Sequence, residues 1–471
     1  MTTQTLKQMP LEQVTAEFLS RHDKAGPRYT SYPTAVEFND NFTPDNYLAR
    51  LKEANKKGGA PLSLYVHIPF CERRCSFCGC NVIISKRREQ ADRYLSYLYK
   101  EITMLAQALP NRRELMQYHW GGGTPTYLNV DQMRALFATV KQHFLIGKDA
   151  EVAIEIDPDV TSLKQLDVAR ELGFNRLSIG VQDFDVKVLA AVNRAEAEKK
   201  TKLLLSHARK IGFKSVNLDL IYGLPHQTPQ SFGITLDKVL ALRPDRLAMY
   251  SFAFVPWIKG NQKQIQKDQL PSRDAKFALF SQAIKAFLNA GYLQIGMDHF
   301  ALPDDEMGRA AQSRTLYRNF MGYTVHSATD MIGVGVSSIG AIDGAFAQNF
   351  KKTVPYYRAI DEGHFPVERG YVLNKDDLVR QRVITHLMCN FHVDFSSIEQ
   401  HFDIDFKQYF KAELYKLTAT EKQMDRPFVR VWDNGIEITP LGRLFVRNVC
   451  MVFDVYLKNK TGETTVFSRT V

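Results

Sequence analysis

The stretch Leu62–Asn81 reads LSLYVHIPFCERRCSFCGCN and carries four of the six cysteines of the chain. It opens with LSLYVHI, a run with the alternation of a buried strand, and the cysteines follow directly. Cys71, Cys75 and Cys78 have the spacing C-x3-C-x2-C, so one loop can present three thiolates to a single inorganic centre. Three sulfur ligands suit an iron–sulfur cluster, and such a cluster keeps one iron open to a ligand from outside the protein.

A structural zinc site and a disulfide framework are the alternatives for these cysteines. A structural zinc site has four ligands, usually as two C-x2-C pairs or with histidines at matching distance, and this chain has no second pair. Cys389 and Cys450 stand alone and are predicted to be buried apolar residues. Six cysteines in 471 residues are too few for a disulfide scaffold. The sequence therefore favours the cluster.

Length and composition are those of an ordinary globular protein with one large domain and smaller units. The chain has 471 residues, of which 45% are hydrophobic and 24% charged. The N-terminus MTTQTLKQMPLEQVTAEF lacks the apolar run of a signal peptide, and no membrane span is visible. We therefore expect a cytoplasmic protein that is not bound to a membrane. Thiols stay reduced in the cytoplasm, as a cluster loop needs.

The net charge of +10 and the pI of about 9.1 leave two kinds of partner open. Basic residues are scattered, with short groups at 86–88 and 199–202 and no arginine-rich stripe. A positive excess also suits a polyanionic small substrate. Nucleic acid is not the expected partner, although composition alone does not decide this.

Strand-like and helix-like runs alternate from Leu62 to about Ala253, which is typical of parallel βα units in an α/β fold. The predicted strands are LSLYVHI, LMQYHW, EVAIEI, RLSIGV, VNLDLIYG and RLAMYSFA. Helical periodicity marks 91–107, 131–143, 162–171, 196–210 and 231–242, and later 272–290.

Polar residues recur where these strands end, which is where parallel barrels collect function. Each alone could be a structural residue satisfied by a neighbouring loop, and the glycine run could be a tight turn. Their recurrence at one end of successive strands favours a binding site. They are Gly121-Gly122-Gly123-Thr124-Pro125, Glu155, Asp157, Gln182, Arg194 and Asp219.

The two ends of the chain differ from this pattern. Residues 1–60 are predicted to form an arm, irregular over GPRYTSYPTAVEF. Residues 61–366 form the predicted catalytic domain, in which Asp298 and His299 are interpreted as a structural pair. Helices, a hairpin and a final helix over PLGRLFVRNVCMVFDVYL predict a small, mainly helical, winged-helix-like domain at 367–471. We assign it a lid or packing role because no basic recognition helix is visible.

The cysteine spacing after a first strand resembles the signature of the radical S-adenosylmethionine (SAM) superfamily. The longer pattern YVHIPFC with CGCN resembles the oxygen-independent coproporphyrinogen III oxidases, anaerobic enzymes of haem biosynthesis, from Gly26 to about Asp454. The resemblance implies an incomplete parallel (β/α)6-type radical SAM barrel. It also implies one 4Fe-4S cluster with an open iron, held by Cys71, Cys75 and Cys78.

Two SAM molecules in each active site are a further implication of the resemblance. Similar GGGTP segments contact the methionine end of SAM. The positions that match those holding the SAM on the cluster are Tyr65, Gly122, Glu155 and Ile339. Those that match positions of a second SAM are Phe77, Gly123, Thr124, Gln182, Arg194, Asp219 and Ala253.

The implied reaction converts two propionates of coproporphyrinogen III to vinyl groups and gives protoporphyrinogen IX. A 5'-deoxyadenosyl radical from SAM takes the hydrogen, so the cofactor performs the difficult step. The resemblance implies an electron donor such as a flavodoxin-type system, and a monomer. No catalytic side chain is certain. Cys80 and His67 beside the cluster loop are candidates, as is Arg28, because the arm lies across the active-site mouth in the resembled family.

Two other functions are alternatives for this sequence. A branch of the same family is a haem-binding chaperone, in which Asp-Phe tends to follow the third cysteine and the GPRYTSYPTA arm is usually lacking. Here Gly79-Cys80-Asn81 follows, which is the oxidase pattern. Radical SAM modification of RNA would draw on the basic pI and the C-terminal domain.

Overall fold

The computed structural model describes residues 11–195, 198–326, 330–424 and 427–457. The chain forms two compact units. The barrel unit consists of Phe38–Ser272 and Ala328–Val372. The second unit consists of the described residues of Met1–Glu37, Arg273–Ser327 and Leu373–Val471. The boundaries of these units differ from those of the predicted domains 1–60, 61–366 and 367–471. The predicted division into three domains stays a prediction.

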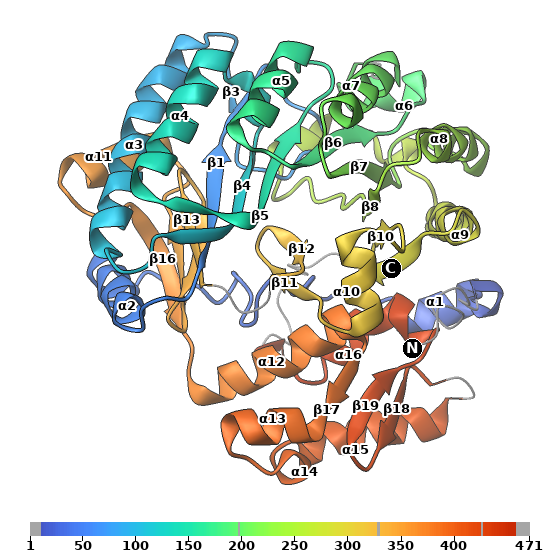
Figure 1. Ribbon diagram of the computed structural model, residues 1–471. Helices are drawn as coiled ribbons and strands as arrows, with labels where there is room; N and C mark the ends of the chain where they lie inside the picture. Colours follow the sequence, from blue (N-terminus) through green and yellow to red (C-terminus); the bar gives the residue numbers. More distant parts are fainter. Residues whose placement is uncertain (1–10, 196–197, 327–329, 425–426, 458–471) are drawn as a thin grey trace. The chain divides into compact units, whose positions relative to one another are not determined.

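Six neighbouring parallel strands form the centre of the barrel unit's sheet (Figure 1). They confirm all six predicted strands. On the other side of β1 lies one more parallel strand, followed by three antiparallel ones. The six central strands are, in spatial order, β1 (Leu62–Ile68), β4 (Glu114–Gly122), β5 (Leu145–Ile156), β6 (Arg176–Gln182), β7 (Ser215–Tyr222) and β8 (Arg246–Ser251). The others are β13 (Asp330–Val334), β14 (Ile339–Ile342), β15 (Ala345–Asn349) and β16 (Val367–Val372).

Helices in the connections cover the outer face of this sheet (Figure 1). Their starts follow from capping residues. Asn129, Ser162 and Thr228 each accept a hydrogen bond from the backbone three residues on. The helices of the barrel unit are α2 (Pro44–Lys56), α3 (Glu89–Ala108), α4 (Val130–His143), α5 (Leu163–Leu172), α6 (Val186–Ala191), α7 (Glu198–Lys210), α8 (Pro229–Leu242) and α11 (Thr353–Asp361).

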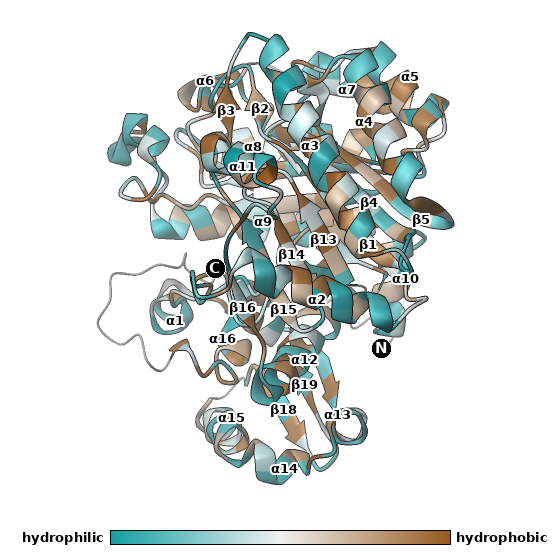
Figure 2. Cartoon of the chain, turned by 90° about the vertical axis from the view of Figure 1, so that its left-hand side faces the viewer, coloured by the Kyte–Doolittle hydropathy of each residue, from teal (hydrophilic) through white to brown (hydrophobic). Residues whose placement is uncertain are grey.

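The alternation of β6 shows how the sheet separates the core from the site. Leu177, Ile179 and Val181 are buried, whereas Ser178 and Gln182 on the opposite face are partly exposed. Apolar side chains therefore pack under the helices, and hydrophobic residues follow the strands in Figure 2. Polar side chains are left on the inner face of the barrel unit.

The second unit contains a helical region and a three-stranded sheet in the order β17-β19-β18. Helices followed by a hairpin appear as predicted. The predicted final helix over PLGRLFVRNVCMVFDVYL is much shorter, since a 3-10 turn at Gly442–Phe445 precedes a helix of only five residues. The elements are α1 (Ala16–His22), α9 (Arg273–Asn289), β9 (Leu293–Gly296), β10 (His299–Ala301), α10 (Glu306–Ser313), β11 (Tyr317–Asn319), β12 (Gly322–Thr324), α12 (Lys375–Asn390), β17 (His392–Asp394), α13 (Phe395–Phe402), α14 (Phe406–Tyr409), α15 (Lys411–Gln423), β18 (Val429–Trp432), β19 (Gly435–Ile438) and α16 (Val446–Cys450).

The irregular segment after Gly26 is held by the C-terminal residues of the same unit. Tyr29 donates a hydrogen bond to Asp454 at 2.9 Å, and Arg447 donates to the carbonyl of Pro27 at 2.8 Å. The predicted arm is thus partly a component of the second unit, whereas residues from Phe38 onward, including α2, belong to the barrel unit. Across the described part of the chain, no helix is long and apolar enough to span a membrane.

Candidate functional site

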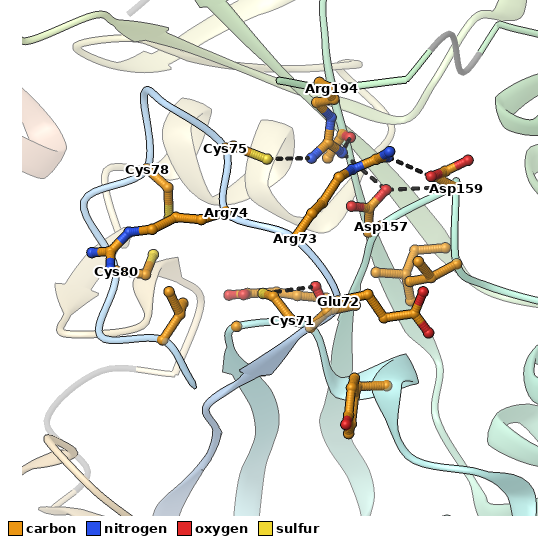
Figure 3. Close-up of a pocket in the computed structure, with 18 of the residues that line it drawn as sticks. Cys71, Glu72, Arg73, Arg74, Cys75, Cys78, Cys80, Asp157, Asp159 and Arg194 are labelled. Atoms are coloured by element: carbon orange, nitrogen blue, oxygen red, sulfur yellow. Dashed lines mark hydrogen bonds and ion pairs between the residues drawn. The ribbon is translucent and has the colours of Figure 1, made fainter. Parts of the chain in front are cut away.

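A cavity of about 390 Å³ lies in the barrel unit where β1 and β4 to β7 end (Figure 3). This volume is within the usual range for small-molecule sites. The wall combines the cysteine loop with residues that follow successive strands. It includes Cys71, Cys75, Phe77, Cys78, Cys80, Gly122, Gly123, Thr124, Glu155, Asp157, Ser178, Gly180, Gln182, Arg194 and Asp219.

The cysteine loop is fixed at its first ligand by a small strand pair. β2 (Phe70–Cys71) pairs with β3 (Ile83–Ile84), and the Ser85 amide donates to the Cys71 carbonyl at 3.0 Å. The Cys71 sulfur lies 3.5 Å from Thr124 Oγ1, and the Cys75 sulfur lies 3.6 Å from an Arg194 nitrogen (Figure 3). The two thiols therefore contact residues that follow two different strands.

The loop environment sets the protonation of the thiols. Burial raises the pKa of Cys71 to about 12 and also raises that of Cys75. A hydrogen bond with the Cys80 thiol lowers the pKa of Cys78 to about 6. Because metals bind thiolates, iron would displace protons from Cys71 and Cys75.

The three thiols fit a cluster better than a single ion. Within the described ranges, no three His, Cys, Asp or Glu side chains converge as ligands of one metal ion. A zinc ion needs all its ligands around one point, whereas a cluster binds each cysteine through a different iron. Three thiols that line one cavity fit the donor set of an iron–sulfur cluster.

The glycines at the end of β4 are required by close packing. A Cβ on Gly122, whose φ is 119°, would lie 2.8 Å from the His67 ring. A Cβ on Gly123 would lie 2.7 Å from the backbone of Pro69 and Phe70. These glycines bring the end of β4 against the cysteine loop, and both still line the cavity. The tight turn thus forms part of the cavity wall.

Glu155 at the end of β5 points into the cavity with an identified partner. His119 Nε2 lies 3.0 Å from Glu155 Oε1, and 44% of the carboxylate side chain remains exposed. A Cβ on Gly121 would lie 2.8 Å from the same carboxylate. One side of Glu155 is therefore held by β4, and the other side faces the cavity.

Asp219 on β7 lies deeper in the barrel unit. Ser178 donates a hydrogen bond to it at 3.0 Å, and Asn217 donates another at 2.8 Å. Burial, together with the nearby negative charge of Glu155, raises the pKa of Asp219 to about 7. The carboxyl group can therefore accept or donate a hydrogen bond near neutral pH.

Arg194 links the loop to the strand ends. Its guanidinium contacts Asp157 at 3.1 Å, the Gly180 carbonyl, and the Cys75 sulfur. Gln182 has a φ of 70°, a left-handed conformation that is rare outside glycine and clusters at functional sites. The cavity wall is thus fixed by interactions between successive strand ends.

Comparisons with known proteins agree with this geometry. Residues 65–239 match the radical SAM superfamily model, and residues 373–445 match the HemN C-terminal domain. Oxygen-independent coproporphyrinogen III oxidase of Escherichia coli K12 is 45% identical over 96% of this chain and 97% of its own length. The chain belongs to this family. The enzyme of the same name from Helicobacter pylori 26695 is 42% identical over 98% of this chain and all of its own.

A solved structure of the family supports the fold. Coproporphyrinogen III oxidase (HemN) from Escherichia coli, described as a radical SAM enzyme, matches with a TM-score of 0.88 and 46% identity. The match covers 91% of this chain and 97% of that one. Membership of the radical SAM superfamily implies a 4Fe-4S cluster and SAM.

Most residues predicted for SAM binding in this oxidase family line the cavity, and three do not. The Tyr65 hydroxyl lies 3.1 Å from His67 Nδ1. The Ala253 carbonyl accepts a hydrogen bond from Gln262 at 3.0 Å. Ile339 on β14 pairs with Gln348 on β15. The roles of these three residues stay predictions.

The three catalytic candidates occupy different surroundings. Cys80 lines the cavity beside Cys78. His67 has both ring nitrogens engaged, since its Nε2 lies 3.0 Å from the Asn81 carbonyl, and burial lowers its pKa. Arg28 belongs to the second unit and forms an ion pair with Asp298, which also contacts His299 at 2.9 Å. His67 and Arg28 thus both have structural contacts.

Sequence reasoning missed residues that orient the predicted ones. His119 stands two positions before Gly121, so the two-residue period of a strand would have placed it on the cavity face. Ser178 lies on the same face of β6 as Gln182, because the two residues are an even number of positions apart. Asn261 carried no sequence signal, because its partners lie in a distant loop.

Proposed function

We propose that the protein catalyses the oxygen-independent oxidative decarboxylation of two propionate side chains of coproporphyrinogen III to vinyl groups, giving protoporphyrinogen IX. The observation that carries this proposal is the cysteine loop facing polar strand ends across one cavity, in a chain of the oxidase family. The relatives are named as oxidases, which supports this function and not the haem-binding chaperone. Gly79-Cys80-Asn81 after the third cysteine points the same way.

Cys71, Cys75 and Cys78 are the proposed ligands of the 4Fe-4S cluster. Bound there, the cluster would supply the electron that cleaves SAM to methionine and a 5'-deoxyadenosyl radical; this radical would take a hydrogen from the propionate, which then loses carbon dioxide and one electron to an acceptor to leave the vinyl group. The protein's part is to hold and orient the reactants. Arg194 keeps Cys75 in place and neutralises charge beside the thiolate.

The strand ends are the proposed SAM-binding surface. Glu155 has a free side toward the cavity and can accept hydrogen bonds from ribose hydroxyls. Asp219, with a pKa of about 7, can contact a hydroxyl or a cationic group. We assign Tyr65, Gly122, Glu155 and Ile339 to the SAM on the cluster. A second SAM is assigned to Phe77, Gly123, Thr124, Gln182, Arg194, Asp219 and Ala253.

The electron donor is proposed to be an acidic carrier of the flavodoxin type. Gly79 and Cys80 are exposed at the edge of the cysteine loop. Arg74 and Lys259 are close enough to this edge to favour the Cys78 thiolate electrostatically. Two cations beside the exposed edge suit an acidic partner. A monomer, a cytoplasmic location and the absence of a nucleic-acid partner stay predictions.

Anaerobic turnover tests the proposal. The protein is reconstituted with iron and sulfide and given SAM, a reductant and coproporphyrinogen III, and the porphyrins are separated by chromatography. We expect vinyl product from the wild type, none from Cys75→Ala, and normal turnover from Cys389→Ala, whose cysteine is buried in the second unit. Tight haem binding without turnover would favour the chaperone instead.

A further inference from the structure

One short turn provides hydrogen-bond donors for a run of backbone carbonyls in the cysteine loop. The turn is the segment Lys259–Gln262, at the start of the 3-10 helix Gly260–Gln264. Asn261 Nδ2 lies 3.1 Å from the Cys75 carbonyl, 3.0 Å from that of Ser76 and 3.0 Å from that of Cys78. Gln262 Nε2 lies 3.5 Å from the Phe77 carbonyl, and Lys259 Nζ lies 2.6 Å from that of Gly79. Every carbonyl from Cys75 to Gly79 thus faces a side-chain donor of this turn.

The orientation of Asn261 is fixed by its partners. All three are carbonyl oxygens, which only accept hydrogen bonds, so the NH2 side of the amide has to face them. The contacts reach the carbonyls of two proposed ligands, Cys75 and Cys78. The amide therefore sets the backbone that carries these two sulfurs.

The turn itself is firmly anchored in the barrel unit. Gln262 donates to the Ala253 carbonyl at 3.0 Å and accepts from the Val255 amide at 2.6 Å. Ile265, just after the 3-10 helix, is buried in an apolar cluster with Val192 and Phe252. Phe77 of the cysteine loop packs against the same cluster. The loop is thus held through its backbone and through one apolar side chain.

The cysteine loop depends on such outside support. Between β2 and β3 its backbone contacts include the turn bond from the Cys78 amide to the Cys75 carbonyl, at 3.2 Å, and the bond from the Ser76 amide to the Val192 carbonyl, at 3.0 Å. A carbonyl in a part-buried loop that loses its donor is destabilised, because the hydrogen bond no longer offsets its removal from water. Several carbonyls losing their donor together would let the loop leave the conformation that gathers the thiols.

We propose that Asn261 is a positioning residue for the iron–sulfur cluster. Its side chain holds Cys75 and Cys78 in register with Cys71. This inference rests on the proposed function only in taking these cysteines as the cluster ligands. Asn261 is not among the residues that line the cavity. It acts through the loop backbone, and its loss changes cluster retention and cluster reduction together.

The test compares Asn261→Asp and Asn261→Ser with Gln264→Ala, which changes an exposed residue of the same 3-10 helix. Each full-length protein is reconstituted anaerobically. Cluster loss to an iron chelator is followed by visible absorbance, and the reduction potential by titration monitored with electron paramagnetic resonance (EPR). The melting temperature of each protein without its cluster reports folding.

We expect Asn261→Asp and Asn261→Ser to lose the cluster at least about ten-fold faster than the wild type, with Gln264→Ala unchanged, because about 1.4 kcal/mol is a factor of ten. Asn261→Asp should also have a lower potential than Asn261→Ser, since its carboxylate opposes the added electron. A general loss of structure would not separate the potentials of the two variants in this way, so the difference in potential shows that position 261 acts beside the cluster. If Asn261→Asp melts at a lower temperature than the wild type, the rate of cluster loss in Asn261→Ser decides the test.

Equal rates of cluster loss in Asn261→Ser and the wild type would overturn the inference and leave the proposed function intact. A wild type that binds no cluster would instead overturn the proposed function. The two failures are therefore distinguishable in one experiment.

Discussion

Glu155 and Glu101 are two carboxylates of the barrel unit with opposite surroundings. Glu155 ends β5, contacts His119 on one side and keeps 44% of its side chain exposed in the cavity. Glu101 on α3 is 2% exposed. Donors surround its carboxylate: the Gly335 amide at 2.8 Å, Asn349 Nδ2 at 2.6 Å and the Tyr356 hydroxyl at 2.6 Å.

The difference teaches how a structural carboxylate can be told apart from one that has an oxygen free to bind a ligand. The oxygens of Glu101 are already used to hold β13 and β15 against α3, so little capacity is left for a ligand. Glu155 has a protein partner that orients it and a free side that can bind. We therefore expect changes at Glu101 to affect stability and changes at Glu155 to affect SAM affinity.

The largest expected effect is on the pH dependence of stability. Burial raises the pKa of Glu101 from 4.5 to about 7. Between these values the folded protein keeps a proton that the unfolded chain has lost. The stability that the proton on Glu101 contributes is therefore complete below pH 4.5 and is lost as the pH rises through 7. The change amounts to about 3 kcal/mol.

Glu101→Gln removes this titration. Urea unfolding of the cluster-free protein at pH 5 and pH 8 should show wild-type stability falling relative to Glu101→Gln by most of that amount, roughly 2.5 kcal/mol. Glu89→Gln on the exposed face of the same helix is the control and should follow the wild type. Parallel pH profiles for wild type and Glu101→Gln would show that Glu101 is ionised throughout.

A smaller effect is expected from Glu155→Gln. Loss of the negative charge toward the cavity should weaken SAM binding by about 10–100-fold, or roughly 1.4–2.8 kcal/mol. The measurement is the dissociation constant of SAM for the reconstituted enzyme, with the melting temperature as a check on folding. Unchanged affinity with a lower melting temperature would place Glu155 with Glu101 and remove the contrast.

The smallest effect is expected from Asp219→Asn, and it should depend on pH. Since the pKa of Asp219 is about 7, the wild type carries a largely neutral carboxyl at pH 6 and a carboxylate at pH 8. The affinity of the variant for SAM should match that of the wild type at pH 6 and should be about 3–10-fold lower at pH 8. A loss of the same size at both values would mean that shape matters here and charge does not.

Local patterns predicted the frame of the site. LSLYVHI gave the bounds of β1, and the cysteine spacing gave one loop with three thiols, because both depend on neighbouring residues. The residues that hold the site in place were not predictable in this way. Asn261 and Cys75 are 186 positions apart, and only the folded chain brings them together. The placement of Phe38–Lys56 with the barrel unit likewise follows from tertiary packing.

The central claim is that three cysteines hold a cluster whose remaining iron binds SAM at the strand ends. The most direct measurement is the EPR spectrum of the reduced cluster with and without SAM, in the wild type and in Glu155→Gln. We predict a spectrum that changes when SAM is added to the wild type and needs a higher SAM concentration to change in the variant. A wild-type spectrum that SAM leaves unaltered would contradict the account.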